Sequence, residues 1–291
     1  MAALRKLLEL VRFSHTVFAL PFALLSAALA WKTEPFRPLD LVGILLGMVF
    51  ARSAAMAFNR LVDRRLDAAN PRTAARHLPA GTLGVGTVVA FTVGCCVLFV
   101  ASTGLFLLRQ PANPWPLYLS GPVLLFVLGY SLAKRFTSLV HVWLGAALGL
   151  APVAAWVAVT GTVAAEPLLL GLAVLLWVTG FDVLYACQDA DFDRAAGLHS
   201  LPARLGVKRS LRLAAGLHAV MVLALAALGR ASPHLGAVYA VGLAAVAGLL
   251  VVEHRLVRPD DLTRVNAAFF QVNGVISVGL LAVVLVQLAI R

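Results

Sequence analysis

Oxygen-bearing side chains recur at four-residue intervals between residues 59 and 67. Asn59, Asp63 and Asp67 follow one another in steps of four, and each step turns only about 40° around an α-helix, so all three share one face. Two carboxylates at this spacing repel one another, and the repulsion grows in dry surroundings. Carboxylate and amide oxygens suit Mg²⁺, which typically binds one or two carboxylates together with a substrate phosphate. The segment therefore predicts a magnesium site.

A second cluster with the same four-residue step begins at Asp182. Its members are Asp182, Tyr185, Asp189 and Asp193, and on one continuous helix they fall within an arc of about 80°. Asp191 points to the opposite side of that helix, so we exclude it. One acidic pair at a helix end is compatible with simple solvation at a membrane surface, whereas two clusters favour metal binding. The absence of His and Cys at these positions argues against zinc.

Basic residues accompany both clusters. A diphosphate keeps negative charge that metal ions alone leave unbalanced, and Arg and Lys side chains can neutralise the remainder. The candidates are Arg72 and Arg76 after the first cluster, Lys134 and Arg135 between the clusters, and Arg204, Lys208 and Arg209 after the second. A bias of basic residues toward the cytoplasmic ends of membrane helices explains the same residues equally well. Both explanations stay open.

The composition is that of an integral membrane protein. Hydrophobic residues make up 61% of the chain and charged residues 13%, against about 45–50% and about 25% in soluble domains. About 20 apolar residues are enough for a helix to cross a bilayer. We expect an all-α bundle of about nine transmembrane helices in a single domain, residues 1–291. The predicted spans are 13–31, 41–61, 84–108, 115–133, 141–160, 167–187, 210–230, 234–253 and 267–290.

The basic residues also predict an orientation. Most of the 24 Lys and Arg residues fall at the N-terminus and in the loops after the second, fourth, sixth and eighth spans, which the positive-inside rule places in the cytoplasm. The acidic clusters end the second and sixth spans, so we expect a site that opens to the cytoplasm. The net charge of +11 follows from this topology, and no nucleic acid partner is expected.

Three ordered motifs resemble those of the UbiA-type membrane prenyltransferases. They are Asn59-x3-Asp63-x3-Asp67 followed by Arg72-Thr73 and Arg76-His-Leu-Pro79-Ala-Gly81; Tyr130-x3-Lys134-Arg135-x-Thr137; and Asp182-x2-Tyr185-x3-Asp189-x3-Asp193. With the nine-span layout, the resemblance covers nearly the whole chain. It implies a helical bundle around a central cavity, closed by the loops after the second and sixth spans. It also implies Mg²⁺-dependent transfer of a polyprenyl group from its diphosphate to an aromatic acceptor.

The resemblance also implies roles for the matching residues. Asn59, Asp63, Asp67, Asp189 and Asp193 are expected to bind the metal and the diphosphate, and the four aspartates and Lys134 are the expected catalytic residues. Arg72, Tyr130, Lys134 and Arg135 are expected to bind the substrate, with Asp182 and Tyr185 shaping the site. The implied partners are a polyprenyl diphosphate, an aromatic acid and the lipid of a bacterial-type inner membrane. No obligate protein partner is expected.

One position departs from the common family pattern. Most members have Asp directly after the Asn of the first motif, whereas this chain has Arg60. On the helix Arg60 lies about 100° from Asn59 and need not face the metal. Asn59-Arg60 together with segments 14–21 and 197–202 resembles the pattern of the subgroup that prenylates a dihydroxynaphthoate in futalosine-route menaquinone synthesis. We therefore expect that acceptor, with the 4-hydroxybenzoate prenyltransferase of ubiquinone synthesis as the alternative.

Two other protein classes agree less well with the sequence. A transporter places ionisable groups near the bilayer midplane, whereas the acidic clusters lie at span ends. A b-type haem protein needs axial histidines that face each other within spans, whereas His141, His218 and His234 lie near predicted ends.

Further polar residues have two explanations each. His15, His199 and His218 are candidates for accepting the ring proton, although a hydrogen-bonded structural role is the commoner one for such residues. Asn266, Gln271 and Asn273 either bind the acceptor or link helices within the membrane boundary.

Overall fold

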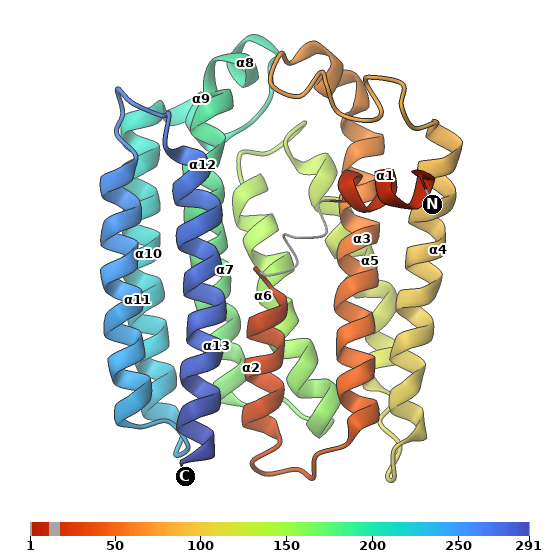
Figure 1. Cartoon of the computed structure of the whole chain (residues 1–291), viewed down its shortest axis with the longest axis vertical. Helices are drawn as coiled ribbons and strands as arrows, with labels where there is room; N and C mark the ends of the chain where they lie inside the picture. The colour runs from red at the N-terminus through yellow and green to blue at the C-terminus, as the bar shows by residue number, and fades with distance from the viewer. Residues whose placement is uncertain (1, 12–17, 291) are drawn as a thin grey trace. The chain divides into compact units, whose positions relative to one another are not determined.

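The computed structural model describes residues 2–11 and 18–290, and the regular elements in this part of the chain are all helical. The all-α prediction is confirmed. In chain order the elements are α1 (Ala2–Leu10), α2 (Leu20–Ala30), α3 (Pro38–Ala69), α4 (Val85–Thr103), η2 (Gly104–Leu108), α5 (Trp115–Ala133), α6 (Val140–Thr160), α7 (Ala165–Ala186), η3 (Cys187–Asp189), α8 (Ala190–Ala195), α9 (Leu201–Leu205), α10 (Val207–Ala231), α11 (Ala237–Leu256), α12 (Val265–Ala267), η4 (Ala268–Val272) and α13 (Asn273–Ala289) (Figure 1).

Eight helical segments in the described part of the chain are long and apolar enough to cross a bilayer. They begin with α3, α4, α5, α6, α7, α10, α11 and α12. The segment that begins with α4 continues through η2, the one that begins with α7 through η3 and α8, and the one that begins with α12 through η4 and α13. The shorter apolar helix α2 lies in the first predicted span, whose residues 13–17 are outside the described part. The chain is a multi-pass membrane protein, consistent with about nine membrane helices.

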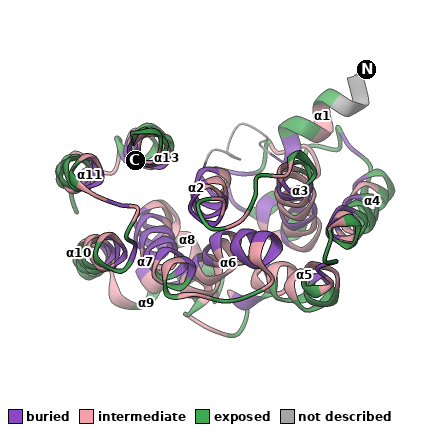
Figure 2. Ribbon diagram, turned by 90° about the horizontal axis from the view of Figure 1, so that it is seen from below, coloured by how far each residue is buried: buried purple, intermediate pink, exposed green. Residues whose placement is uncertain are grey.

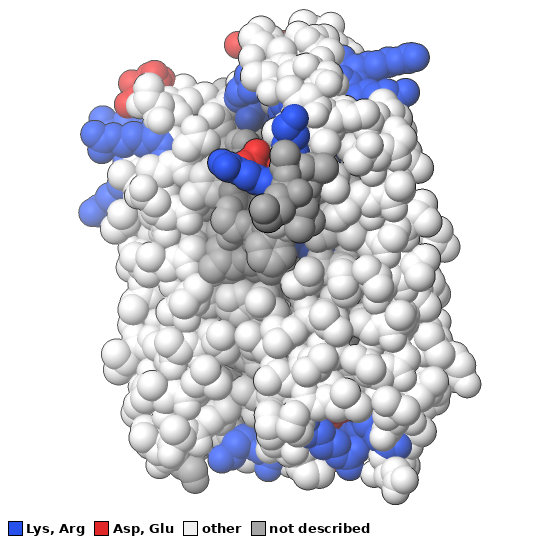
Figure 3. Space-filling view, turned by 45° about the vertical axis from the view of Figure 1, so that its right-hand side comes forward, with Lys and Arg blue, Asp and Glu red and all other residues white. Residues whose placement is uncertain are grey.

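The surface of these helices fits a lipid environment. Large apolar side chains such as Val97, Leu125 and Val241 are 61%, 76% and 72% exposed. On the face drawn in Figure 3, Lys and Arg side chains gather in separate groups, and wide areas carry no charged side chain. Exposed apolar area on this scale marks a membrane-facing or protein-binding surface.

The chain divides into two compact units. One comprises Met1–Thr16 and Arg37–Leu132, and the other comprises Val17–Phe36 and Ala133–Arg291. The first unit holds α1, α3, α4, η2 and α5 up to Leu132, and the second holds α2 and the elements from α6 onward. The expectation of a single domain over residues 1–291 stays a prediction.

In the first unit, the long helix α3 determines where the first acidic cluster lies. Its 32 residues extend about 48 Å at about 1.5 Å per residue, which exceeds the roughly 30 Å of a bilayer's hydrocarbon core. Helix α4 packs along α3. Gly43 lets η2 approach α3, because a Cβ at this position would lie 2.8 Å from two ring carbons of Phe106. The acidic end of α3 can therefore extend beyond the apolar layer.

In the second unit, α7 is the central helix. It packs against α6 on one side and α10 on the other, and Figure 2 shows mostly buried residues along it. Glycines make the α6–α7 approach close: a Cβ on Gly149 would lie 2.6 Å from the carbonyl oxygen of Gly171, and one on Gly171 would lie 2.8 Å from that of Gly149. Small residues are the usual means of close helix packing in membranes.

A buried glutamine in this unit bonds to the backbone at the start of a helix. The side chain of Gln287 is buried, and its Oε1 accepts hydrogen bonds from the N–H groups of Val238 and Tyr239 at 3.1 and 3.3 Å. These are among the first N–H groups of α11, which have no partner within their own helix. Because the bilayer core offers no water to bond them, Gln287 stabilises the start of α11.

The glycine contact between α6 and α7 leads to a stability prediction. The replacement Gly149→Ala should lower the free energy of unfolding by about 1–3 kcal/mol, because the added methyl group forces two backbones apart. Denaturant titration in detergent, followed by tryptophan fluorescence, measures this change. Gly94→Ala in α4 is the matched control, because a Cβ there meets nothing within 4 Å. Equal stability of the Gly149→Ala variant and the wild type would contradict the prediction.

Candidate active site

The first acidic cluster lies at the C-terminal end of α3, with both carboxylates buried. Asp63 and Asp67 are 3% and 6% exposed. The Asn59 Nδ2 group donates a hydrogen bond to Asp63 Oδ2 at 3.2 Å, which places these two side chains on one face of the helix. Helix α3 ends at Ala69, and the extended backbone of Asn70 turns the chain out of the helix.

The chain then folds back onto the end of α3. Thr73 Oγ1 donates to the Asp67 carbonyl oxygen at 3.0 Å, and Arg76 Nη1 donates to Asp67 Oδ1 at 2.7 Å. Asn70 Oδ1 accepts the N–H of Arg72 at 2.9 Å, which tightens the turn between them. Arg76 therefore holds a positive charge against the cluster, while the predicted substrate residue Arg72 is an exposed residue of the same loop.

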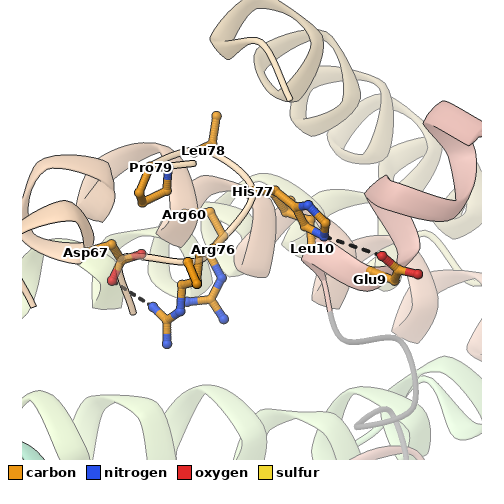
Figure 4. A pocket seen from close by; sticks show the side chains of 9 residues that line it. Glu9, Leu10, Arg60, Asp67, Arg76, His77, Leu78 and Pro79 are labelled. Carbon is orange, nitrogen blue, oxygen red and sulfur yellow. Dashed lines mark hydrogen bonds and ion pairs between the residues drawn. The ribbon is translucent and has the colours of Figure 1, made fainter. Parts of the chain in front are cut away.

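This loop, the end of α3 and α1 enclose a pocket of about 170 Å³ (Figure 4). Arg60, Asp67 and Arg76 line it together with Glu9 and His77, whose side chains approach to 3.6 Å. Arg60 is 9% exposed. The sequence indicated that Arg60 need not face the metal, but tertiary folding places its side chain in the same pocket as Asp67. The pocket is therefore both acidic and cationic.

The donor atoms of the first cluster fit a hard divalent cation. Asp67 Oδ2 is buried and has no hydrogen-bond partner in the described part of the chain, and a buried carboxylate oxygen without a donor is costly. Among the described residues, no three His, Cys, Asp or Glu side chains form a group that could hold a metal ion. Mg²⁺ needs fewer protein ligands than that, because it keeps waters and binds substrate phosphate.

The second acidic cluster spans the end of α7 and two short elements after it instead of one helix. Asp182 and Tyr185 lie in α7, Asp189 ends the 3₁₀ turn η3, and Asp193 lies in α8. The predicted continuous helix was wrong here, because a 3₁₀ turn advances about 120° per residue instead of 100°. The exposure pattern still separates the aspartates. Asp189 and Asp193 are half-buried, whereas the Asp191 side chain is 98% exposed and pairs with Arg194 at 2.9 Å.

The carboxylate of Asp182 has a partner that the sequence did not indicate. His141, the second residue of α6, lies with Nδ1 2.6 Å from Asp182 Oδ2. The two residues are 41 positions apart, so no local spacing pattern links them. The only signal in the sequence was a histidine at the start of a membrane helix.

The predicted element between the clusters follows α5. Tyr130 lies in α5 in the first unit, and Lys134 and Arg135 come directly after that helix in the second unit. Lys134 is half-buried and Arg135 is exposed. The carbonyl oxygen of Lys134 accepts the N–H of His199 at 2.8 Å, which ties this element to the loop after the second cluster.

Of the amides near the C-terminus, Asn273 links helices. It is fully buried, accepts the Trp177 Nε1–H at 2.6 Å and donates to Glu253 Oε1 at 3.0 Å, and it thereby joins α7, α11 and α13. Asn266 and Gln271 are exposed. The sequence did not indicate the buried Glu253.

The three histidines named as proton acceptors differ in their surroundings. His218 is buried and bonds the Trp177 carbonyl oxygen and His254 at 3.1 and 2.9 Å, which is a structural role. His199 is exposed. His15 lies outside the described residues.

The chain is similar to proteins of one membrane enzyme family. A model of the UbiA prenyltransferase family matches residues 19–275. The 4-hydroxybenzoate octaprenyltransferase of Marinobacter nauticus is 33% identical over 236 residues, which is 80% of this chain and 77% of the relative. The enzyme of the same name from Alkalilimnicola ehrlichii is 34% identical over 245 residues, which is 83% of this chain and 80% of the relative.

Solved structures give the same result. The apo structure of a UbiA homologue from Aeropyrum pernix K1 is 34% identical, covers 94% of this chain and 98% of its own, and has a TM-score of 0.83. A UbiA homologue from Archaeoglobus fulgidus bound to DMAPP and Mg²⁺ has a TM-score of 0.71 at 19% identity, covering 98% of this chain and 100% of its own. At 19% identity, the likeness to the Archaeoglobus fulgidus homologue shows a shared fold.

The Asp67–Arg76 pair leads to a prediction that is independent of activity. Asp67→Asn and Arg76→Gln should each lower the free energy of unfolding by about 1–3 kcal/mol, because each leaves a largely buried charge without its partner. The double variant should lose less than the sum, with a coupling energy of about 1 kcal/mol. Denaturant titration in detergent with EDTA measures all three variants.

Arg65→Gln is the control for this cycle. Arg65 is exposed and lies two positions before Asp67, so the two side chains do not face each other on the helix. Its effect should add to that of Asp67→Asn. Additive losses for Asp67→Asn and Arg76→Gln would show that the ion pair does not stabilise the loop.

Proposed function

Since the chain belongs to the UbiA prenyltransferase family, we propose that it transfers a polyprenyl group from polyprenyl diphosphate to 4-hydroxybenzoate in ubiquinone synthesis. The chain is a prenyltransferase, and its acceptor class is aromatic. The observation that carries the proposal is the pair of acidic clusters, each held by a loop that folds back onto it. The two enzymes of Marinobacter nauticus and Alkalilimnicola ehrlichii act, by name, on 4-hydroxybenzoate.

The comparisons therefore favour the alternative acceptor of the sequence analysis over its first choice. They give no support to a dihydroxynaphthoate acceptor and menaquinone synthesis. Both acceptors are hydroxylated aromatic acids, so the same chemistry serves either one. Only a direct comparison of the two substrates decides between them.

We assign the donor site to residues of both motifs. Asn59, Asp63, Asp67, Asp189 and Asp193 supply hard oxygen ligands for Mg²⁺. The buried Oδ2 of Asp67, which has no hydrogen-bond partner among the described residues, supports this assignment. The likeness in fold to a homologue bound to DMAPP and Mg²⁺ supports it further. When bound, Mg²⁺ supplies positive charge that stabilises the departing diphosphate.

The cationic side chains complete the charge balance at the diphosphate. Arg72, Lys134 and Arg135, with Tyr130, donate to its oxygens as negative charge grows there, and such donors lower the barrier most when they are already in place. Arg76 adds a further positive charge, which Asp67 holds at 2.7 Å. Asp182 and Tyr185 shape the donor site from α7.

The reaction exchanges one bond for another. The bond between the diphosphate oxygen and the allylic carbon breaks, and the electron pair leaves with the diphosphate. A ring carbon of the aromatic acceptor then bonds to the allylic carbon, and the ring loses one proton. Apolar walls exclude water that would capture the allylic cation, so a membrane protein suits this chemistry.

We also propose the location and the orientation. The two 4-hydroxybenzoate octaprenyltransferases named above are from bacteria, and the positive-inside rule applied to the basic loops supports a cytoplasmic position for the acidic ends of α3 and α7. The enzyme would then meet its diphosphate and its aromatic acid from the cytoplasmic side of the inner membrane. The isoprenoid tail needs no polar path, because it can lie among apolar helices or in the lipid.

The metal assignment leads to a prediction about two aspartates. Asp63→Asn and Asp189→Asn should each lower the turnover number by at least about 100-fold, because each removes one charged oxygen ligand and its share of leaving-group stabilisation. Turnover is measured with radiolabelled prenyl diphosphate in detergent micelles at saturating Mg²⁺.

Asp191→Asn is the matched control for the second cluster. This exposed aspartate lies between Asp189 and Asp193 in the sequence but pairs with Arg194, so turnover should stay within about twofold of the wild type. Near wild-type turnover of Asp63→Asn or Asp189→Asn would remove that residue from the metal site. An equal loss in Asp191→Asn would contradict the distinction between the aspartates.

The acceptor is tested by direct competition. Membranes that contain the protein are incubated with Mg²⁺ and a polyprenyl diphosphate, and 4-hydroxybenzoate or a dihydroxynaphthoate is offered separately and then together. We expect the mass of prenylated 4-hydroxybenzoate as the main product. Prenylated dihydroxynaphthoate as the sole product would overturn the proposed acceptor and would indicate a role in menaquinone synthesis instead.

A further inference from the structure

The loop that follows the second acidic cluster, residues 196–201, is anchored by residues that the proposed function uses. Three hydrogen bonds hold it: Leu198 N–H to the Asp193 carbonyl oxygen at 2.8 Å, His199 N–H to the Lys134 carbonyl oxygen at 2.8 Å, and Leu201 N–H to His141 Nε2 at 3.4 Å. Asp193 and Lys134 belong to the proposed donor site. His141 is the anchor without an assigned role.

The two ring nitrogens of His141 have defined and different roles. A backbone N–H can only donate, so Nε2 must accept the hydrogen bond from Leu201. In the neutral ring the proton then lies on Nδ1, which donates to Asp182 Oδ2 at 2.6 Å. One imidazole therefore joins a site carboxylate on α7 to the loop that closes the second cluster.

The surroundings of His141 fix the ring in this position. The residue is 4% exposed, and Thr179 Oγ1 on α7 lies 3.4 Å from its carbonyl oxygen. One turn further along α6, a Cβ on Gly145 would meet the carbonyl oxygen of Leu175 at 2.5 Å, so α6 and α7 lie close together here. Burial of the residue and the bonds at both ring nitrogens hold the imidazole in this orientation.

We propose that His141 is a positioning residue for prenyl transfer, which orients the Asp182 carboxylate and anchors the loop 196–201 against the second acidic cluster at the same time. This inference rests on the proposed function and deepens it. In this role His141 holds Asp182 and the loop in place, in the way that the hydrogen-bond partner of a metal ligand orients that ligand. The Asp182 carboxylate supplies the acceptor for one nitrogen, and the loop supplies the donor for the other.

The positioning role has a kinetic signature. Loss of the imidazole leaves Asp182 without its buried donor and frees the backbone of Leu201, so the donor site is less well ordered during the reaction. The contacts that other residues make to the substrates are kept in this variant. His141→Leu should therefore lower the turnover number by about 10–100-fold, while the KM values of both substrates stay within about threefold.

Two conservative variants separate the two hydrogen bonds. In His141→Asn, the amide nitrogen reaches the position of Nδ1 and keeps the bond to Asp182, whereas in His141→Gln the longer side chain reaches the position of Nε2 and keeps the acceptor for Leu201. We expect both variants to recover part of the turnover that His141→Leu loses. Wild-type turnover in His141→Leu, or no recovery in either conservative variant, would overturn the proposal.

A double-mutant cycle tests whether His141 acts through Asp182. If it does, His141→Gln, which keeps the acceptor for Leu201, should have about the same turnover when combined with Asp182→Asn as Asp182→Asn has alone. If the two losses multiply, His141 acts independently of Asp182 and the proposal fails. His234→Leu is the matched control, because His234 lies between α10 and α11 in the same unit; its turnover should match the wild type.

A measurement without turnover separates this inference from the proposed function. Hydrogen exchange followed by mass spectrometry should show faster exchange of the peptide around Leu201 in His141→Leu and His141→Asn, and near wild-type protection in His141→Gln. Unchanged exchange in His141→Leu would overturn the anchoring role. A wild-type protein that prenylates neither acceptor would count against the proposed function, and the exchange result would then decide the role of His141 alone.

Discussion

Burial of carboxylates at the ends of apolar helices is the constraint on which the rest of this structure depends. Burying a carboxylate without a partner costs several kcal/mol of free energy. In both acidic clusters, a side chain from elsewhere in the chain bonds a carboxylate and offsets this cost. Asp67 bonds Arg76 at 2.7 Å, and Asp182 bonds His141 at 2.6 Å. Asp67 Oδ2 has no hydrogen-bond partner within residues 2–11 and 18–290, so this carboxylate oxygen is available to bind a cation.

The same requirement explains why a loop returns to each cluster. In the first unit, Thr73 and Arg76 bring the chain back to the end of α3. In the second, the N–H groups of Leu198 and His199 bring it back to the carbonyl oxygens of Asp193 and Lys134. Each unit thus uses a membrane helix to carry the carboxylates and a polar loop to fix them. A charged substrate can bind to such a site without further ordering of its ligands.

The apolar helices that support these clusters are themselves joined by a few buried polar groups. Asn273 links Trp177 and Glu253 across three helices, and Gln287 bonds the first N–H groups of α11. Glycines such as Gly149 and Gly171 bring α6 and α7 close together. Because lipid offers neither hydrogen bonds nor a strong drive for helices to associate, close contact and internal bonds carry the packing.

The sequence by itself determined the properties that depend on neighbours along the chain. Apolar run lengths gave the membrane helices, and the step of four gave a shared helical face for Asn59 and Asp63, while motif order gave the family. Only the tertiary structure decided the rest: the 3₁₀ turn within the second cluster, the place of Arg60 in a pocket, and the pairing of His141 with Asp182. Periodicity reports local geometry, whereas contacts between residues 41 positions apart depend on how helices pack and where loops return.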